Sequence, residues 1–390
     1  MKNRVNLVIG LISLATIASC VNSTTTTTNP QTTENNNGGF NGGPGGGQKT
    51  TVDSATNISS TSTTNPDTIE VTECSSSSGI DKVICIADAF KKQLDTTQLA
   101  TAQRTYTLSE AKRWSNFPQQ LYREKRVGLN FGSMNSSQII YAKALIAAAA
   151  SNNTANEGWD ELQQLINADE YLKSISGKSD YGSENFYIAL LGTPAKTGKF
   201  EIQFGGHHLA FANTYNDGAL VGATPSFRGV EPSGTFTLNN KANQPMNQEK
   251  DAFVAMLGSL STSELTSAKL SSTFNDIVVG PQKDGTFPTT PSGVKLSSLS
   301  AEQKNLVLNA IKTYVGDVAE SDKYITKYTN ELDETYISYS GNTNLNNRND
   351  YVRIDGPSVW IEYNSQGGIE TSGIHPHSVW RDKTTDYGGV

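Results

Sequence analysis

The chain has 390 residues, 18% of them charged, and its 31 Lys and Arg against 38 Asp and Glu give a formal net charge of −7. This length allows two average domains or one large domain with a substantial core. The shortage of basic residues argues against a nucleic-acid partner, because nucleic-acid affinity rests mainly on neutralising phosphates. Three cysteines exclude both a disulfide scaffold and a zinc site of four thiolates.

The N-terminus has the pattern of an exported lipoprotein. Lys2 and Arg4 precede a mostly apolar stretch over residues 7–17, which is too short to span a bilayer core of about 30 Å. The stretch ends in Ile-Ala-Ser-Cys, which resembles the lipobox of bacterial lipoproteins, with Cys20 as the lipidated residue. An ordinary secretory signal with an incidental cysteine is the alternative. We therefore predict a signal peptide over residues 1–20 and a membrane anchor at Cys20.

The absence of an Asp directly after Cys20, which would be an inner-membrane retention signal, favours the outer membrane of a bacterial cell envelope. Residues 21–70 are rich in Thr, Asn, Gly and Ser and contain almost nothing to bury. Such a segment cannot offset its ordering entropy, so we predict a disordered tether. Its r.m.s. reach is about 40 Å, enough to hold a folded unit away from the lipid surface. We expect residues 71–390 to form a single globular domain.

The first part of this domain has the spacing of helices. Apolar residues at positions 83, 86, 87, 90 and 94 predict an amphipathic helix. Ser137 is expected to open an alanine-rich helix over residues 138–150, and Ser300 with Gln303 has the spacing of a capping box before another helix. Cys74 and Cys85 either form a local disulfide in an oxidising compartment or remain as two buried thiols.

Two later regions alternate polar and apolar residues as strands do. One runs through Phe200, Ile202 and Phe204 into the pair His207 and His208, followed by a strand over residues 209–215. The other has a predicted hairpin, with strands over 351–354 and 359–363, and then a strand that carries His375 and His377. The fold class is therefore α+β, with a helix-rich first half and antiparallel β-structure carrying both histidine segments.

All four histidines of the chain occur in these two pairs. Residues two apart on a strand project to the same face, so His375 and His377 can converge on one point. Adjacent residues on a regular strand point to opposite faces, but a bulge at the preceding Gly205-Gly206 could re-aim His207 or His208. Pro376 lacks a ladder donor, which predicts an edge strand at an accessible rim.

Three or four converging imidazoles predict a transition-metal site at His207, His208, His375 and His377. Three neutral imidazoles with an open position are the ligand set of catalytic zinc, and imidazole also suits copper and iron. A metal-free catalytic or binding site and a purely structural role are the alternatives, because no carboxylate sits at a diagnostic metal spacing.

Several residues near the histidines are candidates for supporting roles. Arg381, Asp382 and Asp386 are candidates to support the site. Asp382 or Asp386 could accept the free ring N–H of a ligating histidine, or Asp382 could pair with a nearby arginine. Glu362 is a candidate general base or fourth ligand, with a solvated strand face as the alternative. The remaining candidates are expected to contact a ligand or simply to be solvated or part of the core: Arg228, Trp380 and Tyr387.

The sequence around these residues resembles the family called domain of unknown function 3500. The resemblance covers roughly residues 80–390 and is carried by Gly206-His207-His208-Leu209, the loop from Thr224-Pro225 to Glu231-Pro232, Arg353-Ile354-Asp355-Gly356-Pro357, His375-x-His377-x-x-Trp380-Arg381-Asp382, and Asp386-Tyr387-Gly388. This resemblance implies which residues form the family's motifs and how far the domain extends, but it implies no reaction.

Two functions follow as hypotheses. The first is an extracytoplasmic enzyme that depends on zinc, copper or iron at the histidines. The second is a surface lipoprotein that captures a ligand or a metal without turnover. The chain has no H-E-x-x-H, G-x-S-x-G or phosphate-loop motif, which excludes the common zincin, α/β-hydrolase and P-loop interpretations.

Overall fold

The structure is a computed structural model that describes residues 69, 71–122, 125–152, 154–238 and 240–389. These residues all belong to one compact unit. The predicted signal peptide, the lipidation site at Cys20 and nearly all of the predicted tether lie outside the described residues. Within the described part, none of the helices combines the length and the apolar character that a membrane span requires.

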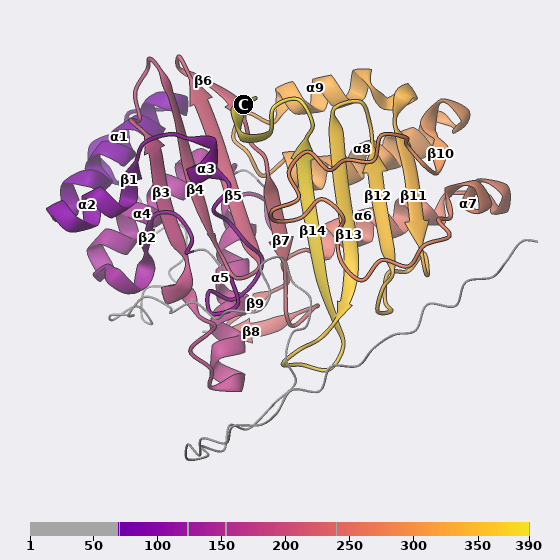
Figure 1. Cartoon of the computed structure of the whole chain (residues 1–390), viewed down its shortest axis with the longest axis horizontal. Helices are drawn as coiled ribbons and strands as arrows, with labels where there is room; N and C mark the ends of the chain where they lie inside the picture. Colours follow the sequence, from indigo (N-terminus) through magenta and orange to yellow (C-terminus); the bar gives the residue numbers. More distant parts are fainter. Residues whose placement is uncertain (1–68, 70, 123–124, 153, 239, 390) are drawn as a thin grey trace, which may run out of the picture. The chain divides into compact units, whose positions relative to one another are not determined.

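A large mixed sheet organises the domain (Figure 1). Its strand order is β1-β3-β4-β5-β7-β14-β13-β12-β11-β10, with β2 added beside β3 and β6 beside β5, while β8 and β9 form a separate ribbon. The strands are β1 (Gln103–Arg104), β2 (Leu129–Asn130), β3 (Tyr187–Gly192), β4 (Lys199–Gly206), β5 (Leu209–Asn216), β6 (Ala219–Gly222), β7 (Ser226–Gly229), β8 (Phe236–Leu238), β9 (Lys241–Asn243), β10 (Val294–Lys295), β11 (Tyr336–Ser340), β12 (Tyr351–Asp355), β13 (Val359–Gly367) and β14 (Ile374–Asp382).

The helices confirm the α+β class, and they occur in both halves of the chain. They are α1 (Gly79–Gln93), α2 (Thr96–Ala102), α3 (Leu108–Ala111), α4 (Ser136–Ala149), α5 (Trp159–Ser176), α6 (Asn247–Gly258), α7 (Thr262–Ala268), α8 (Ala301–Val315) and α9 (Asp322–Asn330). A disulfide joins Cys74 to Cys85 and ties the segment before α1 to that helix.

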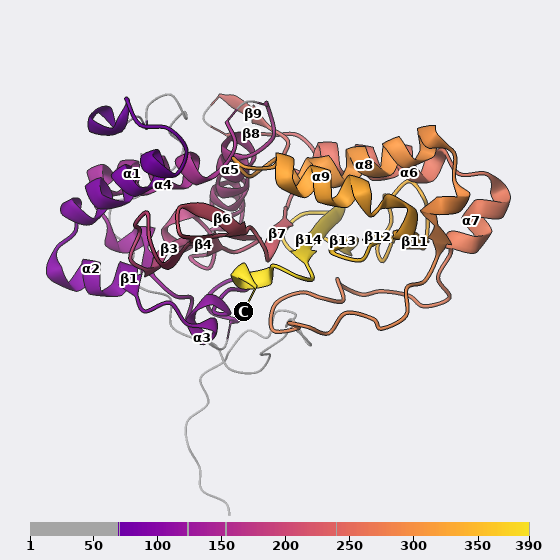
Figure 2. The same ribbon diagram turned by 90° about the horizontal axis from the view of Figure 1, so that it is seen from above.

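The two faces of the sheet are covered differently. Figure 2 shows α1, α4, α5, α6, α8 and α9 on one side, and α3, the segment 270–293 and the C-terminal end on the other. The larger apolar core lies on the helix side and includes Phe200, Ile202 and Phe204 of β4. A smaller cluster on the other side includes Phe227 and Val379. We call these the helix face and the loop face.

The predicted helices and hairpin form, with one difference in where a helix begins. The amphipathic helix is α1, the hairpin is β12–β13, and Ser300 with Gln303 caps α8 as a capping box. The alanine-rich helix starts earlier than predicted, because the side chain of Asn135 rather than Ser137 caps it through the amide of Gln138.

The edge-strand prediction for Pro376 is wrong. β14 lies inside the sheet between β13 and β7. The Pro376 carbonyl accepts from the amide of Val230, one residue past the end of β7. The backbone N–H that proline lacks would therefore point past the last paired residue of β7. No hydrogen bond of the sheet is lost there, so Pro376 is tolerated on an interior strand.

Candidate metal centre

His207 and His208 form the two-residue turn of the β4–β5 hairpin. Gly206 pairs directly with Leu209 across the hairpin, so the predicted bulge is absent. The two glycines instead allow close packing, because a Cβ on Gly205 would lie 2.5 Å from the Leu209 carbonyl oxygen. His208 has a positive φ of 62°, a left-handed conformation that histidine adopts more readily than most residues. This turn directs the two imidazoles differently.

β14 supplies the second pair, and β7 leaves room for it. His375 and His377 alternate along β14 on the loop face, the face of Val379. Gly229 on β7 lies opposite His377, and a Cβ there would lie 3.0 Å from Cδ2 of both His208 and His377. Glycine at this position therefore permits the imidazoles of the hairpin and of β14 to meet.

Three of the four histidines form a compact group. The Nε2 atoms of His208 and His375 are 2.7 Å apart, and the ring centroids of His375 and His377 are 4.6 Å apart. In the described part of the chain, His208, His375 and His377 are the only group of at least three His, Cys, Asp or Glu side chains whose ligand atoms all lie within 4.8 Å of one another. The predicted convergence is thus found for three imidazoles.

His207 lies outside this group, contrary to the four-ligand prediction. Its Nδ1 is 2.6 Å from Oδ1 of Asp169 on α5, and its ring stacks on His208 with centroids 3.6 Å apart. Tyr181 packs on the ring as well. His207 therefore positions His208 by packing while its own ring nitrogen is held by a carboxylate.

Carboxylates also face the other imidazoles. Nδ1 of His377 is 2.9 Å from Oδ1 of Asp276, in the segment 270–293. Nδ1 of His375 is 3.9 Å from Oε2 of Glu231, whose Oε1 accepts from the backbone amides of residues 369–371. Asp276 is at hydrogen-bond distance and fixes the tautomer and the ring orientation of His377, whereas Glu231 is too far from Nδ1 of His375 for a hydrogen bond. With Nδ1 directed to Asp276, Nε2 of His377 is buried and has no hydrogen-bond partner.

The electrostatic environment favours neutral rings at two ligand positions. Burial, followed by the neighbouring imidazoles, lowers the pKa of both His208 and His375 well below its usual value. The guanidinium of Arg126 adds to the effect on His208. Arg126 is itself buried. It donates to the carbonyls of Ser115 and Phe117 and to that of Gly206, directly before the hairpin turn, and so holds the turn against residues 115–117. Neutral imidazole is the form that binds metals.

Glu362 is used to hold the loop face together. Its carboxylate is fully buried and accepts four hydrogen bonds, from the amides of Val278 and Val279, the Tyr351 hydroxyl and the Trp360 indole. These bonds fix the segment that carries Asp276. Glu362 is therefore not part of the three-histidine group, and the structure gives it a role in supporting that segment.

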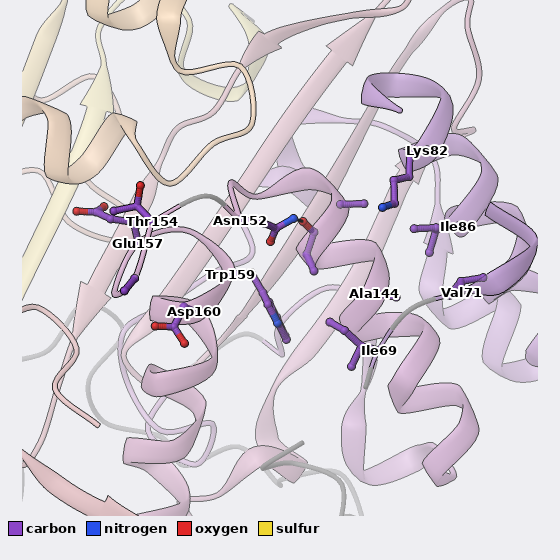
Figure 3. A pocket seen from close by; sticks show the side chains of 13 residues that line it. Ile69, Val71, Lys82, Ile86, Ala144, Asn152, Thr154, Glu157, Trp159 and Asp160 are labelled. Carbon is purple, nitrogen blue, oxygen red and sulfur yellow. Dashed lines mark hydrogen bonds between the residues drawn. The ribbon is translucent and has the colours of Figure 1, made fainter. Parts of the chain in front are cut away.

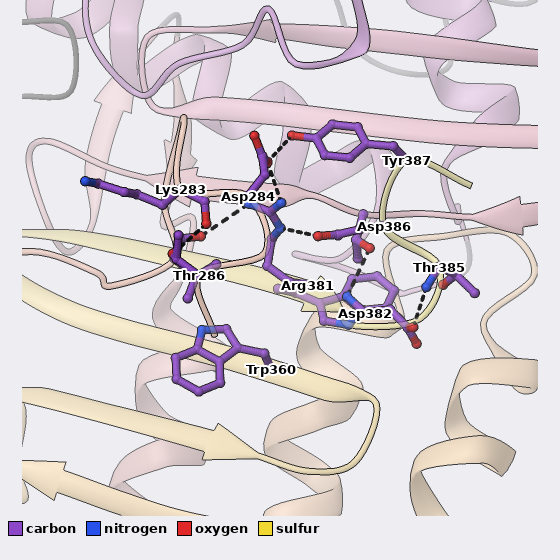
Figure 4. Close-up of polar contacts among 12 residues, drawn as sticks. Lys283, Asp284, Thr286, Trp360, Arg381, Asp382, Thr385, Asp386 and Tyr387 are labelled. Carbon is purple, nitrogen blue, oxygen red and sulfur yellow. Dashed lines mark hydrogen bonds and ion pairs between the residues drawn. The ribbon is translucent and has the colours of Figure 1, made fainter. Parts of the chain in front are cut away.

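Arg381, Asp386 and Tyr387 anchor the C-terminal end on the loop face (Figure 4). The Arg381 guanidinium is buried and binds Asp386 through Nε at 2.7 Å and Asp284 through Nη2 at 2.7 Å. Tyr387 donates to Asp284 as well. In the described structure, Asp386 therefore pairs with arginine instead of accepting from a ligating histidine.

Three other candidates lie on the helix face. The register that pairs His377 with Gly229 pairs Ser378 with Arg228, so Arg228, Trp380 and Asp382 project away from the histidines. Trp380 packs on Tyr324, and Asp382 accepts from Lys327 and Tyr328 rather than from an arginine or a histidine. Asp382 therefore does not support the histidine site, and Arg228 and Trp380 do not contact a ligand there, contrary to the predictions.

The residues that sequence reasoning missed are Asp169, Asp276 and Arg126. Asp169 and Glu161 share the buried side of α5, where a polar helical pattern carries no sign of their partners. Asp276 sits in an irregular segment without a motif. Glu231 belongs to the loop motif that ends at Pro232, but no sequence spacing connects Glu231 with His375.

The comparisons with known proteins identify a family and no further relative. No curated protein and no solved structure matches the chain significantly. A sequence model does match, over residues 76–389, which is nearly the whole described domain. Its description is "protein of unknown function (DUF3500)", and the match includes all four histidines and the carboxylates around them. The chain therefore belongs to the DUF3500 family.

Proposed function

We propose that this protein is an exported, lipid-anchored enzyme that uses a transition metal held by His208, His375 and His377. The observation that carries the proposal is the buried Nε2 of His377, which has no partner while its Nδ1 faces Asp276. A buried polar atom without a partner is costly. A metal at this position would give that nitrogen a partner and would replace the hydrogen bond between His208 and His375.

The local charge supports a cation. Asp169, Glu231 and Asp276 contact three of the imidazoles, while Arg126 is the cation that acts on His208. Three carboxylates against one guanidinium make the surroundings of the imidazoles acidic, which a divalent ion would balance. Zinc, copper and iron all suit imidazole ligands.

The residues prepare such a site for chemistry. Three histidines leave a further coordination position, and a bound zinc would there supply an activated water for hydrolysis, whereas copper or iron would supply redox chemistry. Asp276 holds the tautomer of His377, and Asp169 with His207 supports the ring of His208. The Asp276 side chain is 38% exposed, so this side of the site is the approach we propose for a substrate.

A binding protein without turnover is the second candidate. The four histidines are only 4–6% exposed, and such burial favours retention of a metal over substrate exchange. His375→Ala separates the two functions, because an enzyme should lose turnover while still binding its ligand, whereas a binding protein should lose ligand affinity alone. The membrane anchor at Cys20 is proposed from the lipobox, and the Cys74–Cys85 disulfide agrees with an oxidising compartment.

Elemental analysis by mass spectrometry tests the metal. The full chain, purified without an affinity His-tag, is expected to carry about one equivalent of zinc, copper or iron after reconstitution. The His375→Ala/His377→Ala variant should carry none while remaining folded by circular dichroism. The comparison variant is His207→Ala, which removes an imidazole that packs on His208 without belonging to the group, and it should still take up metal, with lower affinity than the wild type. Absence of metal from the reconstituted wild type would reject the proposal.

Asp276→Asn is expected to weaken metal binding about 10–100-fold, because the ring of His377 loses its anionic partner. Competition with a chelating dye measures the dissociation constant. Asp284→Asn is the matched control, since Asp284 lies in the same segment but binds Arg381 and Tyr387. Equal dissociation constants for Asp276→Asn and the wild type would show that Asp276 does not support the ligand.

A further inference from the structure

A cavity of about 680 Å³ opens on the helix side of the sheet, away from the histidines. It lies between α1, α4 and the start of α5 (Figure 3). Its apolar wall comprises Ile69, Val71, Ile86, Ala144, Ala147 and Ala148. The volume falls in the range of small-molecule sites, which combine an apolar lining with a few placed polar groups.

A lysine and a glutamate occupy the two ends of this cavity. Lys82 of α1 lies at one end with its amine directed toward Asn152, and Glu157 lies at the other, with Trp159 between them (Figure 3). No salt bridge joins Lys82 to Glu157 within the described residues, and the two side chains lie apart, at opposite ends of the site (Figure 3).

These polar groups lack partners in the described part of the chain. The Lys82 side chain makes no hydrogen bond or ion pair there, and Oε2 of Glu157 and Nε1 of Trp159 are buried without a hydrogen-bond partner. Asp160, which also lines the cavity, differs because Lys241 and Gln164 bind its carboxylate. Buried polar atoms normally find partners, so Oε2 of Glu157 and Nε1 of Trp159 indicate a ligand, and the half-buried Lys82 lies where it can bind the far end of that ligand.

The surroundings of Glu157 favour a cation at its end. Burial and the neighbouring Glu161 raise the pKa of Glu157 to about 8, against the opposing effect of Arg228. Glu249 adds a further buried carboxyl group to the same cluster. Arg228 is already bound to Glu161 and Asp317. A ligand ammonium would supply the positive charge that Glu157 lacks.

We propose that this cavity binds a dipolar chain molecule, with a carboxylate at Lys82, an ammonium at Glu157 and a largely apolar body against the alanines of α4. ω-Amino acids and short peptides share this chemistry. Nε1 of Trp159 would donate to an acceptor on the ligand, such as a peptide carbonyl. The site is separate from the metal centre and does not depend on it.

Isothermal titration of the full chain at pH 8 tests the proposal, because Glu157 is then substantially ionised. The probes are 6-aminohexanoate, 8-aminooctanoate and trialanine, with hexylamine and hexanoate as analogues that carry one charge. At least one dipolar probe should bind at one site at least tenfold more tightly than both analogues. Trialanine against the ω-amino acids distinguishes a peptide from an amino-acid ligand.

Variants locate the binding. Lys82→Met and Glu157→Gln should each raise the dissociation constant of that probe at least fivefold. Lys92→Met, an exposed position on the same helix, and Glu302→Gln, on the first turn of α8, should leave it unchanged. Thermal unfolding checks that each variant is folded. Absence of saturable binding to the wild type, equal affinity for the analogues, or insensitivity to both cavity variants would each overturn the proposal.

Discussion

Arg228→Met is expected to lower the free energy of unfolding by about 3–5 kcal/mol, the usual cost of removing one partner from a buried ion pair. Arg228 is 1% exposed, and its Nε donates to Glu161 at 2.7 Å while Nη2 binds Asp317. Methionine fills a similar volume but leaves both carboxylates without their cation. Urea unfolding measures the change.

Two comparisons separate the loss of charge from the loss of packing. The Arg228→Met/Glu161→Gln/Asp317→Asn variant should recover much of the stability, because no isolated charge then remains buried. Arg113→Met is the matched control. Arg113 is 26% exposed, pairs with Glu110 and donates to the carbonyl of Lys125, so its replacement should cost about 1–2 kcal/mol. Similar losses for Arg113→Met and Arg228→Met would contradict the expectation.

The residues of β14, together with Arg228 on β7, show which parts of the site can be predicted from the sequence and which cannot. Alternation along a strand correctly placed His375 and His377 on one face, because the period of two is a property of the backbone. That period also assigns Trp380 and Asp382 to the opposite face, and it should have excluded them as partners of the histidines. Arg228 required the register between β7 and β14, which no local pattern contains.

The turn at His207 and His208 replaces the predicted bulge for a related reason. A Gly-Gly pair before two histidines is compatible with a bulge, and only the pairing of Gly206 with Leu209 reveals a tight turn. The turn explains why one imidazole joins β14 while the other faces α5. Gly229 gave no signal either, because its role depends on the side chains that arrive from two other strands.

The carboxylates around the imidazoles were beyond prediction because each comes from a different layer. Asp169 lies on a helix on one side of the sheet, Glu231 follows β7, and Asp276 belongs to the segment on the other side. Their sequence separations from the paired histidines are 38, 144 and 101 residues. Local composition therefore identified the donors of the proposed metal site but not the side chains that orient them.

Glu249→Gln is expected to stabilise the protein increasingly as the pH rises. Burial and the charge of Glu161 raise the pKa of Glu249 well above 4.5, and both of its carboxyl oxygens are buried without a partner. The folded chain therefore keeps a proton that the unfolded chain releases above pH 4.5. Because the folded state then binds more protons, wild-type stability falls by up to about 1.4 kcal/mol per pH unit above that value.

Glutamine has no proton to release, so its advantage over the wild type should grow by up to about 1.4 kcal/mol per pH unit above pH 4.5, until the pH reaches the raised pKa of Glu249. Urea unfolding of both proteins at several pH values measures this difference. Glu302→Gln is the control, because Glu302 is exposed on the first turn of α8 and its pKa lies below the usual value. Its effect should be constant above pH 5. An equally constant difference for Glu249→Gln would show that Glu249 is ionised in the folded protein, with Arg228 compensating its charge together with those of Glu161 and Asp317.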